Sequence, residues 1–265
     1  MGESAEEPES TSAPLSPRPD SLSGTTLDGK YRVDALVAEG GFGVVYRGVH
    51  LRLKKPVAIK VLKLQHLESD RMRAVVMAQF ESEAATIAKL DHPAVVRVLD
   101  FGIAPMPDGA EAPWMALEWM DGITLAEDLR ARRDEPGRSP KEVLAMLRPV
   151  LAALAKAHAM GIAHRDIKPS NLMLSPRREG ADWAEGEVPV KILDFGIAKE
   201  MHADEQAIAS GQTVTKAAFA AFSLRYATPE QVTSTRTGPW TDVYQMATVI
   251  TELLTNRPPY QGDDA

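Results

Sequence analysis

The hydrophobic pattern changes at Asp121-Gly122, and this change constrains the fold more than any other feature of the sequence. Before it, short apolar runs rich in β-branched residues alternate with turn residues, which is typical of antiparallel strands. After it, apolar residues recur at helical spacing over long stretches. We therefore expect an α+β chain of two lobes, with a sheet lobe at residues 27–120 and a mainly helical lobe at residues 121–265.

The first lobe is expected to contain five strands and one helix. The strands correspond to "YRVDALV", "VVYRGVHL", "PVAIKVL", "VVRVLDFGI" and "PWMALEWM". Ser69 or Asp70 can cap a helix that runs to about Leu90, and the following "DHP" ends it because proline disfavours helical geometry in the preceding residue. Within the fourth strand, the segment "LDFGI" at residues 99–103 is expected to be a strand end and a turn.

Helix starts in the second lobe are marked by capping-box spacing. Thr124 precedes Glu127, and Ser139 precedes Glu142 with proline at the first helical position. A later helix, from about residue 241 to 254, carries apolar side chains on nearly every side, which is typical of a core helix.

Composition excludes several classes of protein. The formal net charge of −7 offers no basic surface for nucleic acid, and the absence of cysteine excludes disulfides and agrees with a cytoplasmic location. Residues 1–26 are rich in Glu, Ser and Pro and have no signal-peptide core, so we expect disorder there. The longest apolar stretch, residues 143–164, is interrupted by polar residues and proline, so we expect no membrane span.

The stretch "VAEGGFGVV", residues 37–45, holds three glycines between two expected strands. Glycine adopts tight turns at little cost, so such a stretch is commonly an ordinary hairpin. It can equally be a loop whose backbone amides surround phosphate groups. The stretch alone leaves both interpretations open, and motifs further along the chain must decide.

A loop between helix and strand patterns, "HRDIKPSN" at residues 164–171, carries three side chains suited to phosphoryl transfer. The carboxylate of Asp166 can accept a hydroxyl proton, and the amine of Lys168 can neutralise a migrating phosphoryl group. The amide oxygen of Asn171 can bind magnesium. The alternative is a polar surface loop without chemistry, but an eight-residue pattern of this kind favours a catalytic loop.

A second acidic position follows in "VKILDFGIAK", where a strand ends at Asp194. It lies 23 residues after Asn171, across one expected strand pair, so both side chains are expected to face the same metal ions.

Seven motifs in this order over residues 31–265 resemble the eukaryotic-type (Hanks-type) serine/threonine protein kinases, in their bacterial form. They are "AEGGFGVV", "VAIK", "FESEA", "HRDIKPSN", "DFG", "YATPE" and "TDVYQMA". The resemblance implies a bilobal kinase fold, the cofactors ATP and Mg²⁺, and protein substrates with Ser or Thr acceptors. Lys168 and "YATPE" favour Ser/Thr proteins over tyrosine and over small-molecule substrates.

The resemblance also assigns nucleotide-binding residues. It implies that Lys60 binds the α and β phosphates, that Glu83 orients Lys60 as an ion pair, and that Leu117 is the gatekeeper beside adenine. It further implies that the backbone amides of Gly40, Gly41 and Gly43 close over the phosphates, that Val45 and Ala58 lie on either side of the adenine, and that the backbone from Glu118 to Met120 hydrogen bonds to it. The other nucleotide-binding candidates in the Gly-rich stretch are Leu36, Val37, Ala38, Glu39, Phe42 and Val44. Alanine at position 38, where the family usually has glycine, puts nucleotide affinity in question but not the fold.

Regulatory roles are implied by the same resemblance. Arg165 is expected to receive a phosphate from the activation segment, with Thr215 as the first candidate and Thr213 as the second. Ser223 offers the hydroxyl that the family places near the catalytic acid. The alternative is that both threonines are solvated loop residues.

The end of the chain raises a separate expectation. Family members continue with further helices and an arginine that pairs with the carboxylate at Glu230, so the C-lobe is expected to be incomplete, with Glu230 buried and unpaired. Such a chain would be marginally stable and weakly active or inactive, although repacking and solvation of Glu230 would remove that cost. An ATP-binding pseudokinase scaffold is therefore the alternative to an active kinase.

Overall fold

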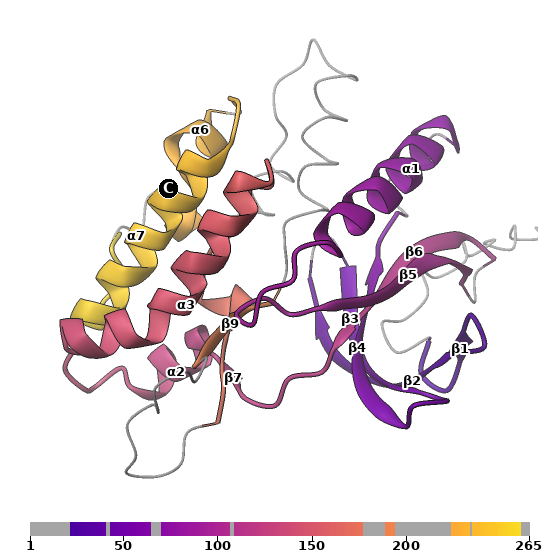
Figure 1. The fold of residues 1–265 in the computed structure, drawn as a ribbon, viewed down its shortest axis with the longest axis horizontal. Coiled ribbons are helices and arrows are strands. Elements are labelled where there is room, and N and C mark those ends of the chain that lie inside the picture. The colour runs from indigo at the N-terminus through magenta and orange to yellow at the C-terminus, as the bar shows by residue number, and fades with distance from the viewer. Residues whose placement is uncertain are drawn as a thin grey trace, which may run out of the picture.

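The computed structural model describes residues 22–40, 43–64, 70–106, 109–176, 189–193, 224–233 and 235–260. Within these ranges the chain forms two lobes, a twisted sheet with one helix and a mainly helical lobe, joined side by side (Figure 1). The two-lobed α+β architecture expected from the sequence is confirmed. Among the described residues, no helix has both the length and the apolar character needed to cross a bilayer.

The first lobe contains a six-stranded sheet in the order β1-β2-β3-β4-β6-β5, with every neighbouring pair antiparallel. The strands are β1 (Thr26–Leu27), β2 (Tyr31–Glu39), β3 (Gly43–His50), β4 (Lys55–Leu62), β5 (Val98–Pro105) and β6 (Glu111–Glu118). All five expected strands are present. The sixth, β1, is too short to produce a hydrophobic alternation that a sequence could reveal.

Strand β5 differs from the expectation in two ways. The segment "LDFGI", expected to be a strand end and a turn, lies inside the strand, which pairs with β6 from Val98 to Pro105. The expected start at Val95 was also wrong, because Val95 forms a parallel bridge with Ile192 and the Val96 amide donates to the Ile192 carbonyl at 2.9 Å. The beginning of this segment is therefore joined to the second lobe.

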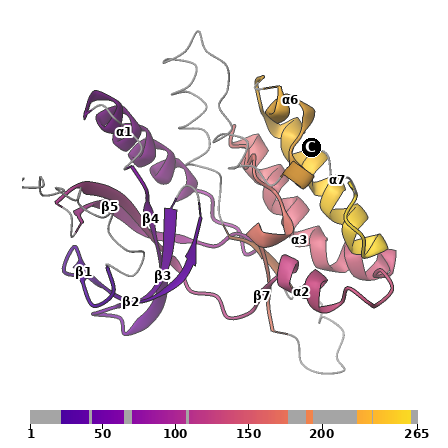
Figure 2. The same ribbon diagram turned by 180° about the vertical axis from the view of Figure 1, so that it is seen from behind.

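Helix α1 (Asp70–Ile87) lies across one face of the sheet, as both ribbon views show (Figure 2). Its buried residues Val76, Phe80 and Ala84 face the strands. The Phe80 ring packs edge to face against Phe101 of β5, with 6.4 Å between the ring centroids. This packing belongs to a hydrophobic core that continues into the second lobe. The two lobes therefore share one core at their junction.

The second lobe is built on two long helices that lie side by side, α3 (Pro140–Ala159) and α7 (Pro239–Thr255). Around them lie a short three-stranded sheet and smaller helices. These elements are β7 (Ile123–Thr124), α2 (Leu125–Ala131), β8 (Leu172–Leu174), β9 (Val190–Ile192), α6 (Pro229–Val232) and the 3₁₀ turns η1 (Pro169–Asn171) and η2 (Leu224–Tyr226). The sheet order is β7-β8-β9.

The two predicted helix starts differ in one detail. At Thr124 the full capping box forms, since the Glu127 amide donates to the threonine hydroxyl and the Glu127 carboxylate accepts from the Thr124 amide. At Ser139 only the first bond forms, from the Glu142 amide at 3.2 Å. The Glu142 carboxylate instead lies 3.4 Å from the guanidinium Nε of Arg138, a charged partner that competes for it.

A second hydrophobic core covers the other face of the six-stranded sheet and includes the start of the described chain. Leu22 is 3% exposed, and the Gly24 amide donates to the Val33 carbonyl at 2.8 Å. The expectation of disorder through residue 26 was therefore wrong for residues 22–26, while residues 1–21 lie outside the described ranges. The conformational entropy lost when this segment is ordered is offset by the burial of Leu22 and Leu27 in the same hydrophobic core as Trp114.

Replacing Leu22 with alanine tests whether this segment belongs to the folded lobe. Leu22→Ala should lower the free energy of unfolding by about 2 to 4 kcal/mol, because it leaves a cavity in this second hydrophobic core. Ser23→Ala, at an exposed neighbour, should change it little. Urea unfolding measures both variants, and equal stability of Leu22→Ala and the wild type would contradict the assignment.

Candidate active site

The face of the sheet that looks toward the second lobe carries four of the predicted nucleotide residues, whereas Val44 is buried in the hydrophobic core on the opposite face. Val45 of β3 pairs directly with Lys60 of β4, and Ala58 pairs with Leu117 of β6. Residues directly opposite each other in a sheet, and residues two apart in one strand, project from the same face. Because Ala58 packs against the core shared with the second lobe, this face points into the junction between the lobes.

The Gly-rich stretch forms a tight connection between β2 and β3. The Gly40 amide donates to the Gly43 carbonyl at 2.9 Å, and a Cβ added at Gly43 would lie 2.5 Å from the Val61 carbonyl oxygen. Glycine is therefore required at position 43, where two backbones approach closely. Gly41 and Phe42 lie outside the described residues.

The remaining residues of this stretch line β2 and the start of β3. Leu36 and Val37 are exposed, 40% and 52% respectively, and a register irregularity separates Leu36 from Ala38. Ala38 pairs with Val45, so alanine at this position is compatible with a regular strand. Glu39 forms an ion pair with Lys63.

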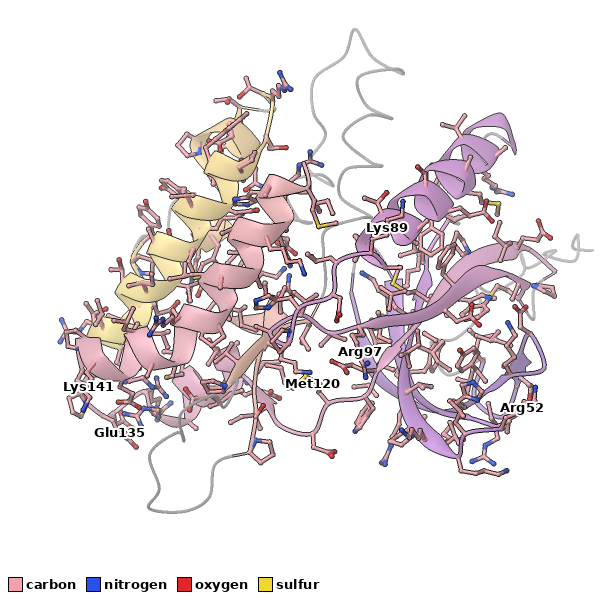
Figure 3. The ribbon with its side chains drawn as sticks, viewed as in Figure 1. Arg52, Lys89, Arg97, Met120, Glu135 and Lys141 are labelled. Atoms are coloured by element: carbon pink, nitrogen blue, oxygen red, sulfur yellow. The ribbon has the colours of Figure 1, made fainter. Side chains whose placement is uncertain are left out.

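The segment that connects the two lobes begins at Glu118, the last residue of β6, and passes Met120 (Figure 3). The Glu118 amide donates to the Arg97 carbonyl at 3.0 Å. Its carboxylate lies 2.7 Å from the Lys191 ammonium and 3.3 Å from the Arg97 guanidinium. Since Lys191 belongs to β9, its ion pair with Glu118 joins the connection to the strand that leads toward Asp194.

The charges around Glu118 change its titration. Burial raises the pKa of the Glu118 carboxyl, but the Lys191 ammonium and the Arg97 guanidinium outweigh burial and hold the pKa below its ordinary value. Lys191 had no role in the sequence analysis, because a lysine in a short strand gives no local sign of a partner 73 positions away.

Because this pKa is lower in the folded protein, the contribution of Glu118 to stability is present above pH 4.5, its ordinary pKa, and is lost as the pH falls further. Lys191→Met should therefore be less stable than the wild type near neutral pH, with a difference that shrinks below about pH 4.5. Urea unfolding at several pH values measures this. Lys141→Met, at an exposed lysine, is the control, and a difference for Lys191→Met that did not vary with pH would contradict the assignment.

The three predicted catalytic residues meet in one loop. The Asn171 amide nitrogen donates to the Asp166 carboxylate at 2.9 Å and to the Asp166 carbonyl at 2.8 Å. The Lys168 ammonium lies 3.1 Å from the same carboxylate, and both side chains are largely buried. A cation and an amide thus both contact the carboxylate of Asp166.

A buried carboxylate on α7 holds the backbone of this loop. Asp242 is fully buried and accepts from the His164 amide at 2.8 Å and from the Arg165 amide at 2.6 Å. Its carboxylate also lies 2.7 Å from Nε2 of His158 on α3. Arg165 has a φ of 63°, a strained value for a residue with a side chain, and these bonds stabilise it.

The other predicted site residues divide into two groups. Glu83 lies on α1, within the part of the chain that the structure describes. Asp194, Thr213, Thr215 and Ser223, together with Phe195, lie outside the described residues. The Leu193 amide donates to the Asn171 carbonyl at 3.0 Å, so the chain next to Asp194 lies beside the catalytic loop.

Glu230 on α6 was expected to be buried and unpaired, and this was wrong. Its carboxylate is only partly buried, and it accepts a hydrogen bond from the Thr241 hydroxyl at 2.8 Å. The penalty expected for a buried charge without a partner therefore does not apply in full.

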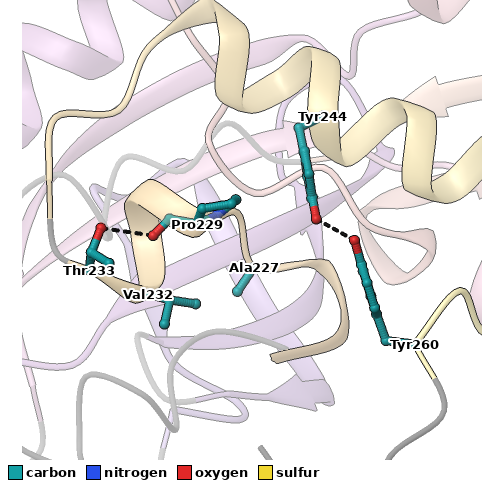
Figure 4. A pocket seen from close by; sticks show the side chains of 6 residues that line it. All are labelled: Ala227, Pro229, Val232, Thr233, Tyr244 and Tyr260. Atoms are coloured by element: carbon teal, nitrogen blue, oxygen red, sulfur yellow. Dashed lines mark hydrogen bonds between the residues drawn. The ribbon is translucent and has the colours of Figure 1, made fainter.

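A hollow of about 370 Å³ lies near Glu230, away from the junction of the lobes (Figure 4). Its lining residues are Ala227, Pro229, Val232, Thr233, Tyr244 and Tyr260. The hydroxyls of Tyr244 and Tyr260 are hydrogen bonded to each other, and this bond, followed by burial, raises the pKa of Tyr244 to about 12. Of the predicted catalytic and nucleotide-binding residues that the structure describes, none lines this hollow.

A sheet lobe with a Gly-rich turn, packed against a helical lobe whose loop joins Asp166, Lys168 and Asn171, defines a protein kinase fold. Residues 31–265 match the protein kinase domain family, and the chain belongs to it. The sequence is 36% identical over 249 residues to the serine/threonine-protein kinase pkn3 of Myxococcus xanthus, covering 94% of this chain and 42% of that protein. It is also 36% identical over 246 residues to PknL of Mycobacterium tuberculosis, covering 93% of this chain and 54% of that protein.

Solved structures show the same fold. The structure titled "PpkA-294 apo form" superposes with a TM-score of 0.65 at 24% identity, covering 94% of this chain and 81% of that one. A mutant form of the kinase domain of Mycobacterium tuberculosis PknI superposes with a TM-score of 0.62 at 26% identity, covering 92% of this chain and 80% of that one. This chain spans about half the length of the curated relatives it matches.

Proposed function

We propose that this chain transfers the γ-phosphoryl group of MgATP to serine or threonine residues of protein substrates. The observation that carries the proposal is the meeting of Asp166, Lys168 and Asn171 within contact distance in one buried loop. Membership of the protein kinase family and the names of the bacterial relatives support it. Since MgATP is supplied in the cytoplasm, we propose that location for the reaction.

Each loop residue has a defined role in this proposal. Asp166 orients the acceptor hydroxyl and takes its proton, because an ionised carboxylate is a hydrogen-bond acceptor. Lys168, held 3.1 Å from Asp166, neutralises charge on the phosphoryl group as it moves toward that hydroxyl. Phosphoryl transfer needs little covalent chemistry from the protein, so positioning and electrostatics account for most of the acceleration.

The donor atoms present fit magnesium and a nucleotide. The amide nitrogen of Asn171 is engaged with Asp166, so its oxygen is the atom that would coordinate Mg²⁺, together with the carboxylate of Asp194. Bound Mg²⁺ supplies positive charge that neutralises the phosphate oxygens. Lys60 would bind the phosphates beside the close backbone approach at Gly43, and the backbone of residues 118–120 would bind adenine.

Two substitutions test the assignment of roles. Asp166→Asn should lower phosphoryl transfer by at least roughly 100-fold while ATP binding stays near normal, because the asparagine cannot take the proton. Lys60→Met should also abolish transfer. A radiolabelled ATP assay with a generic basic protein, beside a separate measurement of ATP binding, distinguishes these effects.

Asp134→Asn is the matched control, because the Asp134 side chain is 90% exposed on the surface. Wild-type turnover of Asp166→Asn, in a preparation free of contaminating kinase, would show that the catalytic role is wrong. A wild-type chain that bound ATP without transferring phosphate would instead be an ATP-binding scaffold.

Activation-segment phosphorylation is the proposed form of regulation. Arg165 directly precedes the catalytic acid, and a phosphate on Thr215, or on Thr213, would form charge-assisted hydrogen bonds with its guanidinium. Such bonds would order the segment between Asp194 and Glu230.

Thr215→Ala should therefore reduce turnover more than Thr213→Ala, without loss of ATP binding. Mass spectrometry of active protein should locate a phosphate on Thr215. If active protein carried no phosphate between Ser210 and Ser223, this form of regulation would be excluded.

A further inference from the structure

Two glutamine side chains lie buried beneath the catalytic loop, and the sequence analysis gave neither of them a role. Gln231 belongs to α6 and is 7% exposed, and Gln245 belongs to α7 and is 2% exposed. A buried amide is costly unless its donors and acceptors are hydrogen bonded. The partners of these two amides therefore indicate what they do.

The two amides bond to each other and to the catalytic loop. Gln245 accepts from the Ile167 amide at 2.8 Å and donates to the Gln231 side-chain oxygen at 3.0 Å. Gln231 in turn donates to the Arg165 carbonyl at 2.8 Å and accepts from the Thr228 amide at 3.1 Å. This pattern fixes which end of each amide is oxygen, because the reverse orientation would place NH₂ groups against backbone N–H groups.

These bonds bracket Asp166. The Arg165 carbonyl belongs to the peptide unit before Asp166, and the Ile167 amide belongs to the peptide unit after it. Asn171 holds the second unit again through the Asp166 carbonyl at 2.8 Å. With both peptide planes fixed, the two backbone dihedrals of Asp166, and hence the direction in which its side chain leaves the backbone, are set.

The glutamines also complete the support of a strained residue. Arg165 has its amide bonded to Asp242 and its carbonyl bonded to Gln231, on either side of a φ of 63°. A backbone in this region persists only where several interactions hold it. Without Gln231, the peptide before Asp166 would lose its shortest bond and keep only the one from the Asp166 amide to Nδ1 of His164 at 3.2 Å and the long one from Gln245 to the Arg165 carbonyl at 3.5 Å.

We infer that Gln231 and Gln245 are positioning residues for Asp166, and that Gln231 links α6 to the catalytic loop. They act through backbone groups and touch no reacting atom. The inference rests on the proposed phosphoryl transfer, in which the direction of the Asp166 carboxylate determines how well the acceptor hydroxyl is aligned.

The test uses Gln231→Met and Gln245→Met in the whole 265-residue chain, since methionine has a similar length and cannot form these bonds. Each should lower kcat by roughly 10- to 100-fold while the KM for ATP stays unchanged. The double variant should lose little more than the worse single variant, because the two amides act as one unit. Thr248→Val is the matched control, since Thr248 is a buried polar residue on α7 whose hydroxyl bonds within that helix.

Amide hydrogen exchange gives a second measurement that does not need activity. In Gln245→Met the Ile167 amide should exchange at least roughly tenfold faster than in the wild type, and in Thr248→Val it should not. If the wild type transferred no phosphate, the proposed function would fail, and exchange would still decide the positioning role. Unchanged exchange at Ile167, or an equal loss of kcat in Thr248→Val, would overturn the inference.

Discussion

The rest of the second lobe depends on one buried carboxylate, that of Asp242. A charge with no exposure to water is stable only when several donors compensate it, and here these are the His164 and Arg165 amides and the His158 ring. The three donors come from α3 and from the catalytic loop, while Asp242 itself is on α7. Satisfying a single charge therefore fixes two helices and one loop relative to one another.

The sheet lobe is joined to these two helices and this loop by a different kind of contact. One hydrophobic core passes from α1 through β6 into α3 and α7, and the ion pair between Glu118 and Lys191 joins the end of β6 to β9. Burial of apolar surface holds the two lobes together, and the ion pair fixes the position of the segment that connects them. Lys60 is thereby placed on a face that looks toward the loop of Asp166.

Local patterns in the sequence predicted the local features of this structure. Alternation in the five long strands and the capping residue Thr124 were sufficient because their signals lie within a few positions of one another. Leu22 was missed, since two leucines in a Pro- and Ser-rich segment do not change its average composition. The roles of Gln231, Gln245 and Lys191 were missed because the partners that define them, in the catalytic loop and at Glu118, lie 66 to 78 positions away and leave no periodic trace. The short spacing of Gln231 from Thr228 indicates only a helix cap. The motifs did bring Asp166, Lys168 and Asn171 together correctly, although their roles remain predictions.

The shortness of β1 has a mechanical consequence for the strand that leads to the Gly-rich stretch. In β2, Tyr31 and Arg32 pair with β1, and the backbone of Val33 bonds to residues 24 and 25 just before β1. From Asp34 onward the strand, as far as the structure describes it, pairs with β3 alone. One register irregularity, at residues 33–35, lies where this singly paired part begins, and a second, at residues 36–38, lies within it. Bending there breaks fewer backbone hydrogen bonds than bending anywhere nearer the centre of the sheet. The start of β2 is therefore held on both sides, whereas its end, next to the Gly-rich stretch, is held on one side and is the part of the strand that bends most easily.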